Sequence, residues 1–169
     1  MSDPMIAIRE ARPHELAAAG DVVVRAYRAL GGGGDAHEAY LEHVRDAAGR
    51  ARHCPVLVAV DEGTGEVLGS VTYVPGQGNA FAELAGEGEG EFRMLGVAPD
   101  AQGRGVGAAL VRACIDLARA GGRHGIVIST TPVMHAAHRL YEHLGFRRAP
   151  ERDWVPVPGI ELWAYVLAL

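Results

Sequence analysis

A run of alternating glycines is the part of this sequence whose residue types and spacing predict chemistry. Gly103, Gly105 and Gly107 stand where a loop leads into a segment with helical periodicity. Glycine lets a ligand approach the backbone closely and adopts angles that other residues avoid. Free N–H groups at the start of a helix attract a phosphate, and Arg104 can add an ion pair. Residues 96–107 therefore predict an anion site, for which a pyrophosphate is the best match.

Three phosphate-binding designs compete for this stretch. A P-loop needs G-x-x-x-x-G-K-[ST], and the sequence has no such Lys-Ser/Thr pair. A dinucleotide-binding turn needs G-x-G-x-x-G/A, which residues 103–108 match. That fold also places an acidic residue at the end of the next strand, whereas residues 125–130 contain none. The third design, Q/R-x-x-G-x-G/A, is met by residues 102–107.

The hydrophobic periodicity predicts a mixed α/β chain around this site. Strands are expected over 5–9, 56–60, 67–74, 91–97, 125–130, 146–148 and 160–167. Helices are expected over 16–30, 35–48, 106–120 and 135–144. The order strand, helix, strand over 91–130 implies a right-handed parallel crossover. Residues 75–90, which carry several glutamates, are expected to form a flexible acidic loop.

Composition narrows the class of protein. The 169 residues are 49% hydrophobic, which suits one domain over residues 1–169. A net charge of −5 argues against nucleic acid as the main partner. Cys54 and Cys114 lack C-x-x-C spacing, so neither a disulfide framework nor a zinc site is expected. The sequence shows no export signal and no apolar run near the ~20 residues of a membrane helix. We therefore expect a cytoplasmic protein without membrane attachment.

Three histidines share one predicted helix and raise the question of a metal. His135, His138 and His143 have no carboxylate or cysteine at matching spacing, so we predict no metal site. His138 is expected on the outward face of that helix, together with the polar residues 139, 142 and 143.

Beyond the glycines, three segments together resemble the GNAT superfamily of N-acetyltransferases. They are Leu95-Gly96-Val97, the loop over residues 102–107, and Leu-Tyr-Glu-His-Leu-Gly-Phe over residues 140–146. The pairing of the loop with the last segment, some 35 residues later, is more specific than the glycine pattern alone. The resemblance implies an α/β fold with a mixed sheet of about seven strands and four helices, in which two parallel strands splay apart.

The resemblance also implies acetyl-CoA as the co-substrate and assigns residues to it. Backbone groups of Leu95, Gly96 and Val97 are expected to pair with the pantetheine arm, which fills the gap between the splayed strands. Backbone N–H groups of the loop and first helical turn are expected to hold the pyrophosphate: Gln102, Gly103, Arg104, Gly105, Val106, Gly107 and Ala108. One position departs from the family, since Met134 stands where many relatives have a cofactor-contacting asparagine.

In the implied reaction a neutral amine attacks the thioester directly, which requires a base, an oxyanion donor and an acid for the leaving thiolate. Tyr141 occupies the position of a family tyrosine near the sulfur, and its phenol is the expected acid. A backbone N–H within residues 95–97 is the expected oxyanion donor. Glu91 is the first choice for the base, acting through a water. The loop glutamates Glu83, Glu87 and Glu89 remain its rivals.

The expected function is therefore transfer of an acetyl group from acetyl-CoA to a primary amine. The acceptor is a small molecule or a peptide or protein amine, and a homodimer is possible. A non-catalytic acyl-CoA-binding or sensing module is the alternative. A nicotinamide-dependent oxidoreductase is a third interpretation, which rests on the glycine pattern alone.

Overall fold

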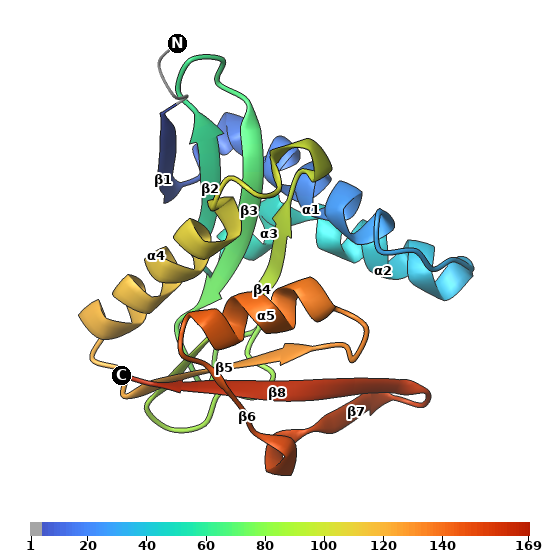
Figure 1. Ribbon diagram of the computed structural model, residues 1–169, viewed down its shortest axis with the longest axis vertical. Coiled ribbons are helices and arrows are strands. Elements are labelled where there is room, and N and C mark those ends of the chain that lie inside the picture. Colours follow the sequence, from blue (N-terminus) through green and yellow to red (C-terminus); the bar gives the residue numbers. More distant parts are fainter. Residues whose placement is uncertain (1–4) are drawn as a thin grey trace. The chain divides into compact units, whose positions relative to one another are not determined.

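The computed structural model describes residues 5–169, whose contacts divide into two compact units (Figure 1). The first unit comprises the chain up to Tyr73 together with Met94–Ala113, and the second comprises Val74–Arg93 and Cys114–Leu169. The expectation of no export signal also concerns residues 1–4, which lie outside the described residues. One domain over residues 1–169 stays a prediction.

Within the described residues the chain forms eight strands, five α-helices and three short 3₁₀ helices. The strands are β1 (Ile6–Glu10), β2 (Val56–Asp61), β3 (Val67–Val74), β4 (Glu89–Val97), β5 (Gly125–Thr130), β6 (Arg147–Arg148), β7 (Trp154–Val157) and β8 (Ile160–Ala168). The α-helices are α1 (Leu16–Arg28), α2 (Asp35–Arg45), α3 (Ala47–Ala51), α4 (Val106–Ala120) and α5 (His135–His143). In this part of the chain, no helix has the length and apolar character needed to cross a bilayer.

The strands hydrogen-bond in the order β1-β2-β3-β4-β5-β8-β6, and β7 pairs with β8. Strands β4 and β5 are parallel, whereas β1–β2, β2–β3 and β5–β8 are antiparallel. The predicted mixed α/β fold is thereby confirmed. Two elements, α3 and β7, were not predicted from the sequence.

A single aspartate explains the extra helix α3. The second helix was expected to continue to residue 48, but it ends at Arg45 because Asp46 adopts a non-helical ψ of 64°. The Asp46 carboxylate then accepts a hydrogen bond of 2.9 Å from the Gly49 N–H and caps α3. Aspartate is a strong N-cap because it satisfies a free N–H of the first turn.

In the first unit, helices cover both faces of the strands. Helix α1 packs on one face and the first turns of α4 pack on the other (Figure 1). The buried core of this unit is almost entirely aliphatic. Its largest fully buried side chains include Val22, Val23, Leu41, Val58 and Leu110. Such a core fixes the end of β4 from Met94 onward and the loop that follows it.

In the second unit, α5 covers the strands β5 and β8 (Figure 1). The core here is partly aromatic, because Phe92, Tyr141, Phe146 and Tyr165 meet with ring centroids about 6 Å apart. Edge-on and tilted contacts of this kind are favourable for aromatic rings. They hold α5 against the start of β4.

An ion pair fixes the turn between β1 and α1. Glu15 is buried and accepts hydrogen bonds from Arg9 Nη1 (2.6 Å), Arg9 Nη2 (3.0 Å) and the Arg12 N–H (2.9 Å). The hydrogen bonds from Arg9 lower the pKa of Glu15 from its ordinary value of 4.5 to about 2. The carboxylate therefore stabilises the fold fully above pH 4.5, and this contribution is lost as the pH falls from 4.5 towards 2.

We expect Glu15→Gln to lower the melting temperature at pH 7 by about 2–4 °C, the shift that ~1 kcal/mol produces in a chain of this size. Between pH 4.5 and 2 the difference from wild type should close, because wild-type Glu15 becomes protonated. Calorimetry across this pH range measures the difference in melting temperature, and Glu10→Gln, a change at an exposed residue, is the control. A difference that is constant with pH would contradict the ion-pair explanation.

Candidate active site

The site begins where the parallel ladder between β4 and β5 ends. The pairing comprises three residue pairs, from Glu89↔Gly125 to Glu91↔Val127, although β5 continues to Thr130. Three residues after Glu91, Met94 has a φ of 56°, in the left-handed region. This conformation costs a non-glycine residue ~1–2 kcal/mol, so the surrounding packing must impose it. The backbone of β4 therefore has an irregular conformation three residues after its pairing with β5 ends.

The three residues after this irregularity are those expected to face the pantetheine arm. Leu95 and Val97 are half-buried and Gly96 is buried. A Cβ atom on Gly96 would lie 2.8 Å from the Val23 Cα of α1 and 3.2 Å from the Ala26 Cβ. The glycine is thus required for the close packing of α1 on the strand, a role that the sequence did not indicate.

The glycine loop presents open backbone to solvent. Residues 102–105 are all exposed, and Gly103 and Gly105 have φ values of 82° and 77°. A Cβ atom built on either glycine meets no atom within 4 Å, so the space above the loop is clear. These conformations are the ones for which glycine is preferred.

Free N–H groups accompany this open backbone. The first N–H bonded within the helix is that of Ala109, which donates to the Gly105 carbonyl at 3.0 Å. Those of Val106, Gly107 and Ala108 precede it and have no intrahelical partner by helix geometry. With the positive end of the helix dipole, they form a cradle of donors of the kind that attracts a phosphate.

The side chains around the cradle differ in what they can add. Arg104 is exposed and has no recorded partner within residues 5–169, so its guanidinium is free to pair with a phosphate. Gln102 is also exposed. Val106, by contrast, is buried and anchors the start of α4 in the core. The cradle therefore depends chiefly on the backbone.

Tyr141 lies in the second unit on the buried face of α5. Its ring packs against Phe92, Phe146 and Tyr165, with centroid distances of 5.7 to 6.0 Å. Burial raises the pKa of its phenol, and the nearby Cys114 adds to the effect, so the hydroxyl stays protonated at neutral pH. Within residues 5–169 this hydroxyl has no recorded hydrogen-bond partner. It is therefore a proton donor available to a ligand.

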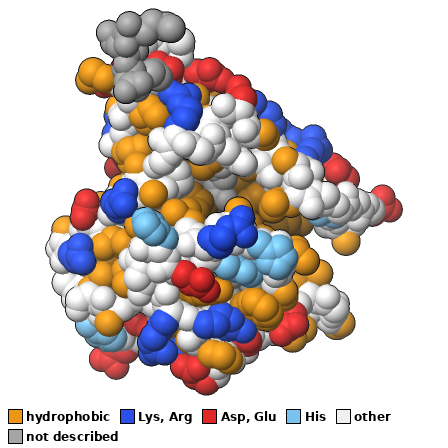
Figure 2. All heavy atoms as spheres, in the orientation of Figure 1, with side chains coloured by type: hydrophobic (Ala, Val, Ile, Leu, Met, Phe, Trp, Pro, Cys, Tyr) orange, Lys and Arg blue, Asp and Glu red, His pale blue; other side chains and the backbone are white. Residues whose placement is uncertain are grey.

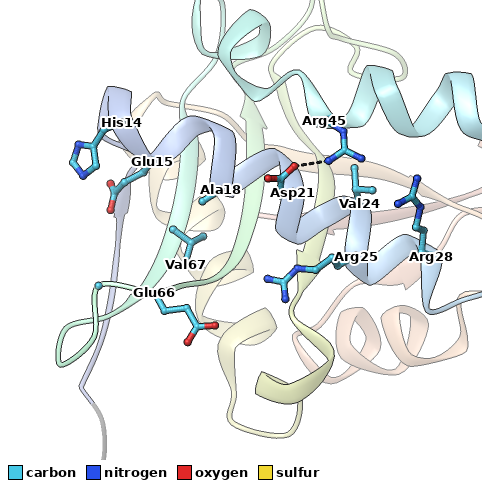
Figure 3. Close-up of a pocket in the computed structure, with 11 residues that line it drawn as sticks. His14, Glu15, Ala18, Asp21, Val24, Arg25, Arg28, Arg45, Glu66 and Val67 are labelled. Carbon is cyan, nitrogen blue, oxygen red and sulfur yellow. Dashed lines mark hydrogen bonds and ion pairs between the residues drawn. The ribbon is translucent and has the colours of Figure 1, made fainter.

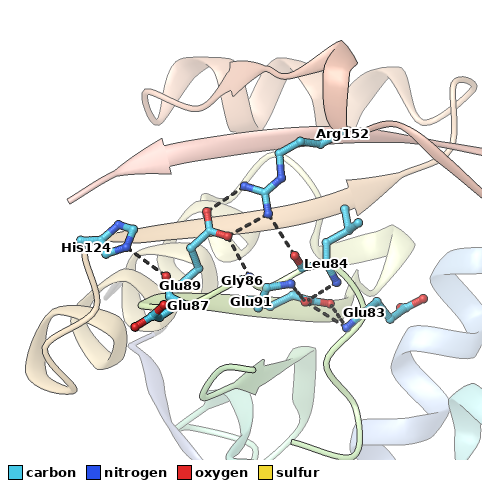
Figure 4. Close-up of polar contacts among 9 residues, drawn as sticks. Glu83, Leu84, Gly86, Glu87, Glu89, Glu91, His124 and Arg152 are labelled. Atoms are coloured by element: carbon cyan, nitrogen blue, oxygen red, sulfur yellow. Dashed lines mark hydrogen bonds and ion pairs between the residues drawn. The ribbon is translucent and has the colours of Figure 1, made fainter. Parts of the chain in front are cut away.

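Glu91 is buried beneath the acidic loop, residues 75–88 (Figure 4). Only 1% of its surface is exposed. Its Oε1 accepts the N–H groups of Glu83 (3.1 Å), Leu84 (3.0 Å) and Ala85 (2.9 Å), and its Oε2 accepts the Glu83 N–H at 3.1 Å. A carboxylate offers about four acceptor positions, so this one is engaged by the loop backbone.

Two further ion pairs fasten the same loop. Arg152 donates to both carboxylate oxygens of Glu89 at 2.8 Å and to the Leu84 carbonyl at 3.0 Å (Figure 4). These bonds lower the pKa of Glu89. Arg93 pairs with Glu83 and donates to a loop carbonyl. The expected flexible loop is thus corrected, because its backbone is fixed by buried and bidentate contacts that residue types alone do not reveal.

His138 is buried and does not lie on the outward face of its helix, where it was expected. Only 7% of this residue is exposed, because its ring stacks on Trp163 and Tyr165 at centroid distances of 5.4 and 5.5 Å. Its Nε2 donates to the Thr131 carbonyl at 3.0 Å, and burial lowers its pKa. Figure 2 shows arginine and histidine side chains gathered over α5, and the exposed basic residues of this helix include Arg139 and His143. Among the described residues, no group of three or more metal-ligating side chains is placed to hold an ion.

A groove of about 620 Å³ lies in the first unit, between α1 and the start of β3 (Figure 3). No residue predicted for the site lines it. Several of its charged side chains already have partners: Arg45 with Asp21, Arg28 with Glu38, and Glu15 with Arg9. The groove gives no support to a catalytic role.

Two residues near the candidate site, Met94 and Arg152, were not predicted from the sequence. Met94 carries no signal, because methionine is not a residue that favours a positive φ. Arg152 lies 63 positions from its partner Glu89, so no local pattern connects them. The residues just before Arg152, Pro150 and Glu151, give little indication that this arginine pairs with Glu89 of β4.

Comparisons with known proteins agree with this geometry. Residues 23–146 match the model of the acetyltransferase (GNAT) family. The chain is 40% identical over 70 residues to N-acetylaspartate synthetase of Danio rerio, covering 41% of this chain and 25% of that protein. It is 33% identical over 108 residues to mycothiol acetyltransferase of Beutenbergia cavernae, covering 63% of this chain and 33% of that protein. The chain therefore spans a quarter to a third of the length of these curated relatives.

A solved GNAT acetyltransferase of Brucella melitensis, in complex with acetyl-CoA, superposes with a TM-score of 0.63 at 23% identity. The superposition covers 99% of this chain and 90% of that one. At this identity the likeness concerns the fold.

We expect Glu91→Gln to destabilise the protein by ~1–3 kcal/mol, because its amide NH₂ would face backbone N–H donors and leave buried groups unsatisfied. Urea unfolding measures the loss, and limited proteolysis should cut the acidic loop sooner. Glu87→Gln, an exposed change in the same loop, is the control and should stay within ~0.5 kcal/mol. Equal stability of the two variants would show that Glu91 does not hold the loop.

Proposed function

The chain belongs to the GNAT acetyltransferase family, and we propose that it transfers an acetyl group from acetyl-CoA to a primary amine. The observation that carries this proposal is the open cradle of N–H groups between Gln102 and Ala108. Acetyl-CoA supplies the acetyl group as a thioester. The chain's own residues must bind the diphosphate, orient the acetyl group and move protons.

Binding is assigned mainly to backbone. The N–H groups of Gln102, Gly103, Arg104 and Gly105 and of the first turn of α4 would hold the diphosphate. The exposed guanidinium of Arg104 would add a charge-assisted contact. Backbone groups of residues 95–97 would pair with the pantetheine arm, as the resemblance to the family implies, and the pairing of β4 with β5 has ended by then, at Glu91.

Proton transfer is assigned to side chains. The Tyr141 hydroxyl would donate its proton to the departing thiolate. Its retained proton supports this role, as does the lack of a recorded hydrogen-bond partner for the hydroxyl within residues 5–169. A backbone N–H of residues 95–97 would stabilise the negative charge that develops on the acetyl oxygen. Glu91 as the base stays a prediction, and the four N–H contacts of its carboxylate count against direct contact with the amine.

The acceptor that we propose is a small-molecule primary amine. The names of the curated relatives refer to N-acetylaspartate and to mycothiol, which are small molecules. A panel of such amines, assayed by release of the free CoA thiol, tests the proposal. Acetyl-CoA binding without turnover of any amine would instead favour the non-catalytic acyl-CoA-binding module.

We expect Gly105→Glu to weaken CoA binding by ~100-fold or more, equivalent to about 2.8 kcal/mol, because a carboxylate would enter the phosphate cradle. Isothermal titration calorimetry with CoA measures the effect. Gly105→Ala is the matched control, since it shares the unfavourable φ of 77° without the charge. If both variants bind CoA equally well, the diphosphate lies elsewhere.

We expect Tyr141→Phe to lower kcat ~100-fold while leaving the KM for acetyl-CoA near wild type. Phenylalanine preserves the ring contacts with Phe92 and Phe146 and removes only the hydroxyl. Steady-state kinetics with an accepted amine, together with a melting curve, measure the two effects. A drop in melting temperature with unchanged kcat would assign the tyrosine to packing alone.

A further inference from the structure

The base that deprotonates the amine can be sought among the four glutamates around the acidic loop. Glu91 is sealed, with 1% exposure and four contacts from loop N–H groups. Glu89 is held by Arg152 through two bonds of 2.8 Å, which lower its pKa and make it a weaker base. Glu87 is exposed, and no recorded contact within residues 5–169 positions its carboxylate.

Glu83 differs from the other three in combining a fixed backbone with an accessible carboxylate. Its N–H binds both oxygens of Glu91 at 3.1 Å, which holds its main chain at the point where β4 leaves β5. Its side chain pairs with Arg93 and keeps 24% of its surface exposed. Glu83 can therefore touch a ligand, whereas Glu91 cannot.

The Glu83 carboxylate and the Tyr141 hydroxyl, which is the proposed acid, lie on opposite faces of β4. Phe92 contacts Tyr141 of α5, so it faces the helix. Its neighbours Glu91 and Arg93 point to the opposite face, because side chains alternate along a strand, and both contact the acidic loop. Glu83 thus lies on the face of β4 opposite to Tyr141, next to the end of the β4–β5 ladder.

We infer that Glu83 is the general base of the proposed acetyl transfer, and that the buried carboxylate of Glu91 holds it in place. The inference rests on the proposed function. The amine approaches on the Glu83 face, and the thiolate departs on the Tyr141 face. An amine that arrives as a cation is attracted to the Glu83 carboxylate before it is deprotonated.

The proton balance is complete with these groups. Glu83 takes one proton from the substrate ammonium and releases it to water. The nitrogen lone pair then forms the bond to the acetyl carbon and an electron pair moves to the acetyl oxygen; the carbon–sulfur bond breaks as the carbonyl re-forms. The nitrogen loses its second proton by the same route, and the thiolate receives the Tyr141 proton, which water replaces. The products are an N-acetyl amine and free CoA.

Burial supports the role by raising the pKa of Glu83. The charged groups that act on it are Arg93, which opposes the rise, and Glu91, which adds to it. A raised pKa places the carboxylate closer to the working pH, which suits a general base. The base is active when ionised, so turnover should fall as the pH drops through this pKa.

The test compares Glu83→Gln with Glu87→Gln, which lies in the same loop and is exposed. Wild type is first assayed for CoA release with a panel that includes aspartate, glucosamine, spermidine and hydroxylamine. With an amine that is cationic at pH 7, Glu83→Gln should lower kcat by ~100-fold or more. The KM for acetyl-CoA should stay at the wild-type value, and the melting temperature should fall by no more than about 2–4 °C, because the part-exposed ion pair with Arg93 is worth at most ~1 kcal/mol. Glu87→Gln should behave as wild type.

Hydroxylamine separates a base from a structural residue. It is largely neutral at pH 7, so the defect of Glu83→Gln should shrink by at least ~10-fold with this acceptor, whereas a distorted loop would impair both acceptors alike. Carboxyl ¹³C NMR gives a readout that does not depend on activity. The Glu83 resonance is identified by its absence from the spectrum of Glu83→Gln, and in wild type it should titrate above the ordinary glutamate range.

The outcomes separate the two proposals. If wild type turns over no amine, the proposed function fails and the inference fails with it. If wild type is active and Glu83→Gln retains kcat, or loses equal activity with both kinds of acceptor, only the assignment of Glu83 is overturned. Titration of Glu83 at or below the ordinary range overturns it as well.

Discussion

The early end of the parallel ladder between β4 and β5 is the constraint on which the rest of the site depends. Parallel strands normally continue to satisfy each other's N–H and C=O groups, and unpaired groups in a protein interior are costly. Here three residue pairs form, and three residues past the last of them Met94 has a φ of 56°, which its own side chain does not favour. In the proposed function the backbone groups of residues 95–97, which follow, bind the pantetheine arm of the cofactor.

Around the start of β4, the charged side chains and the aromatic cluster lie on opposite sides of the strand. On one side an aromatic cluster surrounds Tyr141 and keeps its phenol protonated. On the other, Glu91 and two arginine–glutamate pairs fasten the acidic loop. A group that donates a proton and a group that accepts one need different environments. Because side chains alternate between the two faces of β4, this one strand provides both environments.

The sequence sufficed for the features that local patterns determine. Glycines at 103 and 105 marked the open loop, and both adopt the positive φ for which glycine is suited. Periodicity located most helices and strands, including α4 to the residue. Features created by distant contacts were beyond such patterns. His138 was expected on the surface and is instead stacked on β8. Glu91 was singled out for its charge, but the four N–H contacts that engage it come from a loop expected to be flexible.

Gly96 allows helix α1 to pack closely on the strand that precedes the glycine loop. The space for a methyl group at this position is taken by the backbone of α1 at Val23, which cannot move aside as a flexible side chain can. Any side chain larger than hydrogen at this position would therefore push the α1 backbone away from the strand. The distance between the helix and the strand is in this way set by the absence of one methyl group.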